Sequence, residues 1–397
     1  MLQYSLKKEN LIKTPVYLIV FCAFFDTHAQ MPILAPYTLS LGATPFLLGL
    51  VIGFYSLFNI FGNYTGGILI DAKGWQQPLF LGLAGAALGL LLYTRAESAY
   101  HLIIVRAGHG FMGGLLVPAA LSSLTDGKIF RSFYNSRLAL FGSTIGLAAV
   151  TGPLFAGITA GYLGFHAVYY SLALLLLSAL AIALLLLRKK SSPGRKQTSP
   201  GNNNDLPDIT IKWILTRPKL RGTFLFALGT MGSTGTLASF LPERAELLGL
   251  DHARTGLLFA TFAITAIIVQ LLWPGLLKPL LKKDLSGCTI GLAFLCAALI
   301  LAALAPSAAL LFTAMILYGI GFGVSFQGML GMVMENADPA WRGRAIGVFF
   351  AAYSLGVAVM PPLSGLVWQY VPFIFPFYTS AAVALLSLGA GNKSCSN

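Results

Sequence analysis

Charged residues are scarce in this sequence. Asp, Glu, Lys and Arg make up 10% of the 397 residues, while hydrophobic residues make up 56% and the mean hydropathy is +0.78. Soluble domains carry about 25% charged residues, and so few charges do not cover a surface in water. The shortage of charge excludes a set of soluble domains and predicts that lipid surrounds most of the chain.

Cysteine and histidine are also too few and too scattered to build a site. The four cysteines include no C-x-x-C pair, and the five histidines show no metal-ligand spacing. The chain also lacks a Walker loop, a dinucleotide-binding fingerprint and a catalytic Ser/His/Asp arrangement. We therefore expect no disulfide framework, no metal site, no cofactor and no enzymatic activity.

Acidic residues are the scarcer charge, with 13 Asp and Glu against 26 Lys and Arg. An excess of basic residues is typical of nucleic-acid binding when it is concentrated on one face of a soluble module. This chain offers no such module, so we expect no nucleic-acid partner and interpret the excess as a signal of membrane topology.

Long apolar runs dominate the sequence instead. A membrane-spanning helix needs about 20 mostly apolar residues, and twelve such runs can be counted. They lie near residues 15–37, 45–70, 76–94, 101–123, 137–160, 164–187, 221–242, 255–277, 286–305, 308–334, 344–367 and 370–390. The runs are apolar on all sides, whereas strands of a membrane barrel alternate polar and apolar residues. The sequence thus predicts an all-α membrane protein with twelve transmembrane helices.

The loops between these runs differ sharply in basic residues. One side of the predicted membrane receives 22 of the 26 Lys and Arg, the other receives three, and Arg106 lies inside a run. Because basic loops mark the cytoplasmic side, we predict that both termini are cytoplasmic, in a bacterial-type inner membrane.

A change of composition divides the chain. The stretch 188–220 is rich in basic residues, Gly, Ser and Asn, and predicts a flexible linker between one bundle at 1–187 and another at 221–397. The charge of this linker is interpreted as a topology signal, with binding of anionic lipid as the alternative.

The two halves of the chain also resemble each other. Gly108-His-Gly110-Phe in the fourth run matches Gly319-Ile-Gly321-Phe in the tenth, and Gly152-Pro153 matches Pro361-Pro362. The offsets lie between 206 and 211 residues. Several matches in the same order indicate a duplicated unit of six helices, and parallel repeats are one of the architectures of transporters.

Three local patterns resemble signatures of the major facilitator superfamily. The loop after the second run carries Gly67, Asp71, Lys73 and Gly74, the fourth run carries Arg106-Ala-Gly-His109-Gly110, and the fifth carries Gly152-Pro153. His109 stands where the family pattern has Gln, and Ala148 and Ala156 replace two glycines. The set is similar to bacterial drug/proton antiporters and implies two pseudo-symmetric six-helix bundles around a central cavity.

The resemblance also assigns a role to the loop motif. Asp71 is expected to dock against the eleventh span while the cytoplasmic side is closed, and to be released when that side opens. A plain loop carboxylate is the alternative. Gly67 and Gly74 are interpreted as close helix contacts, like the small-x-x-x-small pairs such as Gly110/Gly114.

Ionisable residues within the spans are the candidates for coupling. Asp26 lies roughly 16 Å into the first span at 1.5 Å per residue, and Arg106 enters the fourth span at a matching depth. A charged Asp at the bilayer centre costs about 2.5–3.5 kcal/mol, so we expect Asp26 to face a cavity or a partner, with Arg106 as the candidate. Asp26 is interpreted as the proton-coupling acid. The alternatives are a structural hydrogen-bond partner and a substrate ligand without proton transfer.

Polar residues near this pair are the candidates for a substrate cavity. They are Gln30 on the first span, Tyr55 and Asn59 on the second, His109 on the fourth and Gln327 on the tenth. For His109 a packing role is favoured over a proton relay.

Together these features predict a secondary active transporter that works by alternating access as a monomer. One embedded acid and one embedded cation favour proton-coupled efflux of a small, moderately apolar, neutral or cationic solute such as a drug, because an organic anion would need more cations. The alternative is uptake or export of a small metabolite, such as a sugar or an amino acid, by symport or facilitated diffusion. The expected partners are that solute, protons and the lipid bilayer.

Overall fold

The computed structural model describes residues 2–125, 130–187, 211–281, 283–338 and 341–396. Every regular element in these residues is a helix. Ten of the helices are long and apolar enough to cross a membrane, and α1 with α2 makes an eleventh span if this bent pair is counted as one. The last helix, α15 (Phe375–Ser396), occupies the position of the twelfth predicted span. The prediction of an all-α membrane protein is confirmed.

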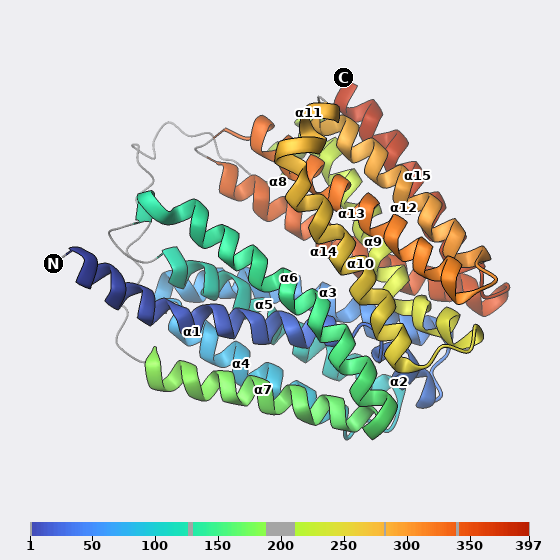
Figure 1. The fold of residues 1–397 in the computed structure, drawn as a ribbon, viewed down its shortest axis with the longest axis horizontal. Helices are drawn as coiled ribbons and strands as arrows, with labels where there is room; N and C mark the ends of the chain where they lie inside the picture. Colours follow the sequence, from blue (N-terminus) through green and yellow to red (C-terminus); the bar gives the residue numbers. More distant parts are fainter. Residues whose placement is uncertain (1, 126–129, 188–210, 282, 339–340, 397) are drawn as a thin grey trace.

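The first half of the chain supplies α1 to α7 (Figure 1). The first predicted span consists of two helices, α1 (Leu2–Ala29) and α2 (Leu34–Ser40), and α2 is inclined by 49° to the segment Pro15–Ala29 of α1. Pro32 lies in the turn between them and has no N–H group to continue the helical hydrogen bonds. The remaining helices are α3 (Pro45–Lys73), α4 (Gln76–Tyr93), α5 (Ala99–Thr125), α6 (Phe130–Leu163) and α7 (Phe165–Leu186).

The second half supplies α8 to α15. These are α8 (Ile211–Leu215), α9 (Pro218–Leu247), α10 (His252–Leu272), the π-helical turn η1 (Trp273–Leu277), α11 (Lys278–Leu281), α12 (Asp284–Leu304), α13 (Ala308–Asn336), α14 (Arg342–Tyr370) and α15. The predicted break between the last two spans at residues 368–370 is wrong, because α14 continues to Tyr370. Pro372 marks the break instead. Residues 188–210 of the predicted linker lie outside the described residues.

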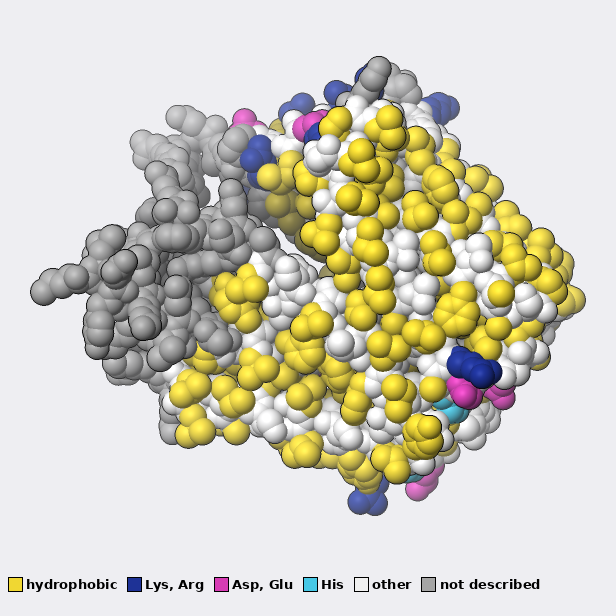
Figure 2. Space-filling model, in the orientation of Figure 1, with side chains coloured by type: hydrophobic (Ala, Val, Ile, Leu, Met, Phe, Trp, Pro, Cys, Tyr) yellow, Lys and Arg dark blue, Asp and Glu magenta, His cyan; other side chains and the backbone are white. Residues whose placement is uncertain are grey.

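The charged side chains of the visible face lie near its ends. Figure 2 shows hydrophobic side chains over the middle of this face, with Lys, Arg, Asp and Glu at its margins. Leu185, Leu271 and Leu386 are among the large apolar side chains that stay exposed. An apolar belt between polar ends matches a protein whose sides face lipid.

Two helix pairs join the halves at close range. α3 packs against α14, and α6 packs against α10. A Cβ atom at Gly49 would overlap the carbonyl oxygen of Pro361, and a Cβ atom at Gly256 would overlap that of Pro153. Backbones approach this closely only where a side chain is missing, so these glycines set the distance between the halves.

The sequence repeat relates these two contacts. Gly256 follows Gly49 by 207 residues and Pro361 follows Pro153 by 208, both within the offsets of the repeat. α3 and α10 are therefore equivalent helices, and so are α6 and α14. Exchanging the halves maps one contact onto the other, which is the pseudo-symmetry that the sequence predicts.

Both contacts lie at the same end of the molecule. Gly49 is in the second turn of α3, and Gly256 is in the second turn of α10. The two halves converge near α2 and diverge toward the side on which the N-terminus lies (Figure 1). The halves are thus closed against each other at the α2 end.

Candidate functional site

A buried polar cluster surrounds Asp26 in the first half. Asp26 is 2% exposed near the end of α1. Its Oδ1 atom accepts a hydrogen bond of 2.7 Å from Nε2 of Gln30, and its Oδ2 atom lies 2.9 Å from Nε2 of His109 on α5. Gln30 follows Asp26 by four residues and therefore lies on the same side of the chain. Both carboxylate oxygens have a partner.

Arg106 belongs to the cluster but does not pair with Asp26. Its Nη1 atom donates hydrogen bonds to Oε1 of Gln30 at 3.0 Å and to the hydroxyl of Tyr93 at 3.2 Å. Its Nε atom donates to the carbonyl oxygen of Val51 at 3.1 Å. The guanidinium also lies 4.4 Å from the centre of the Tyr55 ring, a cation–π distance. The candidate Asp26–Arg106 pair is thus a bridge through Gln30.

His109 is the ionisable group in direct contact with Asp26. It is 1% exposed, so it does not line an open cavity in this conformation. Its Nδ1 atom lies 3.4 Å from the Tyr93 hydroxyl. The ring also makes edge contacts with Tyr55 and Tyr93, at centroid distances of 5.4 and 5.8 Å. His109 therefore packs and also joins a carboxylate to a phenol.

Glycines on neighbouring helices make room for this cluster. Gly89 on α4 faces His109, whose Cβ atom would lie 3.1 Å from a Cβ atom added there. A Cβ atom at Gly110 would overlap the carbonyl oxygen of Tyr55, so α5 and α3 touch at the level of the site. Arg106 and His109 are three residues apart and share one face of α5. The Gly-rich fourth span thus brings its two basic side chains against α3 and α4.

The buried ions of the cluster are compensated. A carboxylate or a guanidinium inside a protein is tolerated only when it is paired and hydrogen-bonded. Asp26 and Arg106 meet this condition through Gln30, His109 and Tyr93. With Asp26 ionised and His109 neutral, the cluster carries no net charge.

The other candidate cavity residues differ in how close they lie to this cluster, since the Tyr55 ring contacts Arg106 and His109 whereas Asn59 and Gln327 have no hydrogen bond with Asp26. Tyr55 is half-buried, and its hydroxyl lies 3.3 Å from Oγ1 of Thr27. Asn59 donates a hydrogen bond to the carbonyl oxygen of Gly110 at 3.3 Å and accepts one from Asn63. Its side chain therefore joins α3 to α5 and to the next turn of α3. Gln327 is half-buried on α13 in the other half, and the side-chain partners of Asp26 are Gln30 and His109 instead.

Tyr93 is the member of the cluster that sequence reasoning missed. It is fully buried at the end of α4, and its hydroxyl contacts both Arg106 and His109. Nothing in the sequence distinguishes it from the tyrosines that are common at the ends of membrane spans. Only the packing of α4 against α5 places it at the site.

The charged residues of the loop motif are exposed in this conformation. Asp71 and Lys73 are exposed at the end of α3, and Asp71 makes no ion pair with another described residue. Gly74 ends α3 with φ 82°, a backbone conformation that favours glycine. A Cβ atom at Gly67 would meet no neighbouring atom, so the interpretation of Gly67 as a close helix contact is wrong. Gly114 does fit it, since a Cβ atom there would lie 2.5 Å from the Asn59 carbonyl oxygen.

The fifth-span motif is a packing element. A Cβ atom at Gly152 would come within 3.0 Å of the backbone of α1 at Phe25 and Ala29. The carbonyl of Pro153 faces Gly256 across the junction between the halves. These two residues hold α6 against α1 on one side and against α10 on the other.

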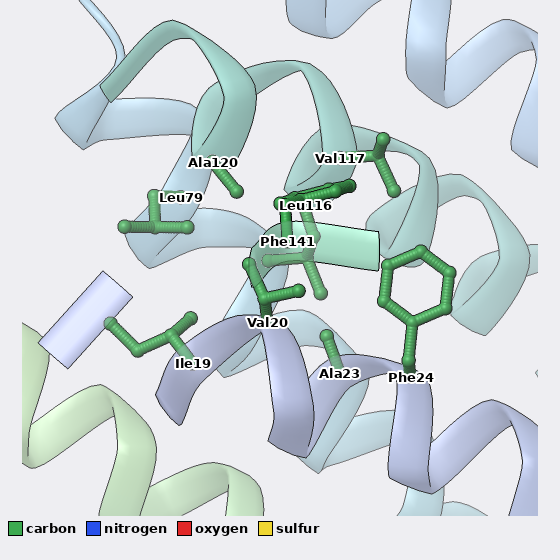
Figure 3. A pocket seen from close by; sticks show the side chains of 9 residues that line it. All are labelled: Ile19, Val20, Ala23, Phe24, Leu79, Leu116, Val117, Ala120 and Phe141. Atoms are coloured by element: carbon green, nitrogen blue, oxygen red, sulfur yellow. The ribbon is translucent and has the colours of Figure 1, made fainter. Parts of the chain in front are cut away.

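The described residues offer few other sites. They contain no group of three His, Cys, Asp or Glu side chains that would hold a metal ion. Figure 3 shows an apolar recess between α1, α4, α5 and α6, lined by residues such as Val20, Leu116 and Phe141. Its volume of about 10 Å³ is close to that of a single water site, which is too small for a substrate.

Bundled apolar helices in two pseudo-symmetric halves, with a buried ionisable cluster between the helices of one half, are an arrangement typical of membrane transporters. Residues 16–354 and 223–391 match the family model of the Major Facilitator Superfamily. The chain belongs to this superfamily, and it is a transporter rather than an enzyme.

Individual relatives are distant. The inner membrane transport protein YajR of Escherichia coli is 23% identical over 345 residues, which cover 84% of this chain and 72% of that protein. Multidrug resistance protein MdtG of Enterobacter lignolyticus is 29% identical over 195 residues, covering 48% of this chain and 46% of that protein. Multidrug resistance protein 3 of Bacillus subtilis is 24% identical over 333 residues, covering 70% and 64%.

Solved structures share the fold. An inward-facing bacterial homologue of the lysosomal transporter Spinster has a TM-score of 0.77 at 14% identity, covering 97% of this chain and 98% of that one. The nucleoside transporter NupG has a TM-score of 0.78 at 15% identity, covering 96% and 98%. At such identities these likenesses establish the arrangement of the helices.

Proposed function

We propose that this chain is a proton-coupled exporter of small, moderately apolar solutes that are neutral or cationic, and that Asp26 carries the proton. The observation that carries the proposal is the burial of Asp26 between Gln30 and His109, with Arg106 one residue farther along the network. A buried carboxylate that contacts an imidazole and is linked to a cation through one amide is able to take up or release a proton when the conformation changes these contacts.

The charge of the cluster supports exchange rather than co-transport of a cation. The cluster is neutral with Asp26 ionised and gains one positive charge with each proton. A protonated site repels a cationic solute and an ionised site admits it, so the two cations exclude each other. Nη1 and Nε of Arg106 are already engaged by Gln30, Tyr93 and Val51, which leaves this cation poorly placed to bind an organic anion.

The other half offers an apolar counterpart. Phe322 and Phe326 stack at 6.1 Å on α13, and Tyr353 of α14 contacts Phe326 at the same centroid distance. All three rings are half-buried. Aromatic faces attract apolar and cationic solutes, in keeping with the multidrug resistance proteins among the relatives.

The conformation suggests the direction of opening. The halves touch through Gly49 and Gly256 at the end that the basic loops assign to the outside. Asp71, which the family resemblance expects to dock when the cytoplasmic side closes, is exposed. We infer an inward-facing state, and alternating access then requires these glycine contacts to part. Reporter fusions should place both termini in the cytoplasm, and an external terminus would reverse the assignment.

The test uses everted membrane vesicles loaded with a proton gradient and a pH-sensitive dye. We expect some members of a panel of neutral and lipophilic cationic antibiotics and dyes to release the gradient through the wild-type chain. Asp26→Asn keeps the shape of the side chain and removes its titration, so it should abolish this response. Glu246→Gln, an exposed position on α9, is the matched control.

The result also decides the alternative. If no compound of the panel is transported and a labelled sugar or amino acid enters cells through the chain, the protein is a metabolite transporter. If Asp26→Asn retains full proton-driven transport, Asp26 has a structural role. Mass measurement of the chain in native nanodiscs checks the expected monomer.

A further inference from the structure

The hydrogen bonds around Asp26 have fixed directions, because Arg106 only donates. Its Nη1 atom donates to Oε1 of Gln30, so the amide of Gln30 points its NH₂ group at Oδ1 of Asp26. Oδ1 is therefore always an acceptor while Arg106 and Gln30 stay in place. Any proton that Asp26 takes up must be carried on Oδ2.

A second series of hydrogen bonds also connects Arg106 to Asp26, through Tyr93 and His109. Nη1 donates to the oxygen of the Tyr93 hydroxyl, which leaves the Tyr93 proton free to point at Nδ1 of His109. Nδ1 is then an acceptor, and Nε2 carries the imidazole proton and donates it to Oδ2 of Asp26. The neutral imidazole and the ionised carboxylate are thus the states that satisfy every atom of this ring of side chains.

Protonation of Oδ2 is incompatible with these directions. Two hydrogens would then lie between Oδ2 and Nε2, so Nε2 must lose its proton. The balanced change is that the Nε2–H bond breaks as an O–H bond forms on Oδ2, while the proton that the transporter takes up binds Nδ1. The imidazole then donates from Nδ1 to the oxygen of Tyr93, and the Tyr93 hydroxyl proton needs a new acceptor.

Tyr169 is the residue whose ring stacks on Tyr93. Its ring lies parallel to the Tyr93 ring, with centroids 4.7 Å apart and planes inclined by 2°. The Tyr169 side chain is fully buried on α7, and its hydroxyl has no hydrogen-bond partner among the described residues. A buried hydroxyl without a partner is unfavourable, and this one belongs to the ring that stacks on Tyr93, the tyrosine whose hydroxyl must turn.

The other titratable groups around Asp26 do not replace Tyr169. The groups that face the cluster are Arg106 and His109 of α5, Tyr55 of α3, Tyr93 of α4, Tyr169 of α7 and Tyr37 of α2. Tyr55 is held by Thr27, and the Tyr37 hydroxyl donates to the main-chain oxygen of Tyr93 at 2.6 Å. The described part of α6, which also packs against α1, adds no titratable side chain to the cluster.

We propose that Asp26, His109, Tyr93 and Tyr169 form a hydrogen-bond switch in which protonation of Asp26 reverses the His109–Tyr93 arm and turns the Tyr93 hydroxyl toward Tyr169, directly or through one water. Tyr169 is a positioning residue in this scheme, since it acts through Tyr93. The switch rests on the proposed proton coupling. It adds that protonation of Asp26 changes a hydrogen bond between α4, which carries Tyr93, and α7, which carries Tyr169.

The test follows the titration of Asp26 without a substrate. Infrared difference spectra of the full chain in lipid bilayers, recorded as the pH is lowered, should show one carboxylic-acid band that is absent from Asp26→Asn. Tyr169→Phe keeps the ring stack and removes the acceptor of the protonated state. The substitution removes one hydrogen bond from the protonated state, which lowers the equilibrium constant for protonation about tenfold. The midpoint of the band should therefore move to lower pH by about one unit. Tyr170→Phe, at an exposed neighbouring position, should leave the midpoint unchanged.

The outcomes separate the two proposals. If the band is absent from the wild type or persists in Asp26→Asn, proton coupling through Asp26 fails. If the band depends on Asp26 but Tyr169→Phe leaves its midpoint in place, the switch alone is overturned. In that case Tyr169→Phe would only remove an unsatisfied buried hydroxyl, and the thermal stability of the chain would rise with no shift of the band.

Discussion

The first and fourth spans of each half meet through polar side chains, but with different chemistry. In the first half, α1 and α5 meet through Asp26 and His109. In the second half, α9 and α13 meet through hydroxyl groups: Tyr318 lies 2.8 Å from Ser233 and 2.9 Å from Thr234. Gly232 occupies the repeat position of Asp26. The duplication kept the packing of the halves, but at these two contacts only the first half carries ionisable groups that pair as ions.

The difference indicates that the two contacts have different roles, one in packing and one in the response to pH. Hydroxyl groups exchange donor and acceptor roles without gaining charge, so the contact in the second half holds its helices together over a wide pH range. The contact in the first half changes its charge when a proton binds. A response to pH should therefore belong to the first half, while the packing contacts at Gly49 and Gly256 should be equivalent.

The largest expected effect is the loss of the buried cation. Arg106→Leu removes the donor of both hydrogen-bond chains and leaves Asp26 without a compensating charge. Breaking a buried charge network costs about 3–5 kcal/mol, so we expect a strongly lowered melting temperature in nanodiscs and no transport. Arg95→Leu, at an exposed position, is the control. A stable Arg106→Leu chain would show that the cluster is open to water.

The contacts between the halves test the symmetry itself. Gly49→Leu and Gly256→Leu each place a side chain on a backbone of the other half. Overpacking costs about 1–3 kcal/mol, enough to shift the balance between conformations by roughly tenfold. Both variants should open the α2 end, seen as longer distances between spin labels across it. Gly161→Leu, where a Cβ atom meets no neighbour, should not. Opposite responses of the two variants would contradict equivalent halves.

The hydroxyl contact should matter less. Tyr318→Phe removes the partner of Ser233 and Thr234 and should lower stability by about 1–2 kcal/mol. Because no charge is involved, the pH dependence of transport should stay that of the wild type. Tyr93→Phe disturbs the partner of His109 and should alter that dependence. A pH profile altered by Tyr318→Phe would place part of the coupling in the second half.

The smallest effect separates the two glycines of the loop motif. Ala at Gly74 would have to adopt φ 82° and ψ 167°, a backbone region that is essentially restricted to glycine and costs about 1–3 kcal/mol for other residues. Gly67 lies within α3 in open space, so Gly67→Ala should stabilise the helix by roughly 0.5–1 kcal/mol. Chemical denaturation of both variants measures the difference. Equal effects would mean that the turn at Gly74 tolerates a side chain.

Much of the architecture follows from composition and spacing. Runs of about 20 apolar residues must become helices in lipid, because each backbone N–H and C=O group needs a partner within its own segment. The repeat of Gly49 by Gly256 and of Pro153 by Pro361 predicts the pseudo-symmetry, since equivalent sequences pack in equivalent ways. The positions of helix breaks were less predictable. Pro32 bends the first span, whereas the run at Trp368 continues as helix to Tyr370.

The buried site shows where sequence by itself stops. The depth of Asp26 and Arg106 in their spans is a matter of counting residues, and it placed both at one level of the membrane. Which side chains touch depends on how each helix is rotated and how closely glycines let its neighbours approach. Only the packing of α1, α4, α5 and α7 decided that Gln30 bridges the two charges, that His109 is the direct partner of Asp26, and that Tyr93 and Tyr169 stack behind it. Composition and order along the chain determined that this is a duplicated helical membrane transporter. Contacts shorter than about 3.5 Å between residues far apart in sequence are set by side-chain packing, and the tertiary structure alone determined them.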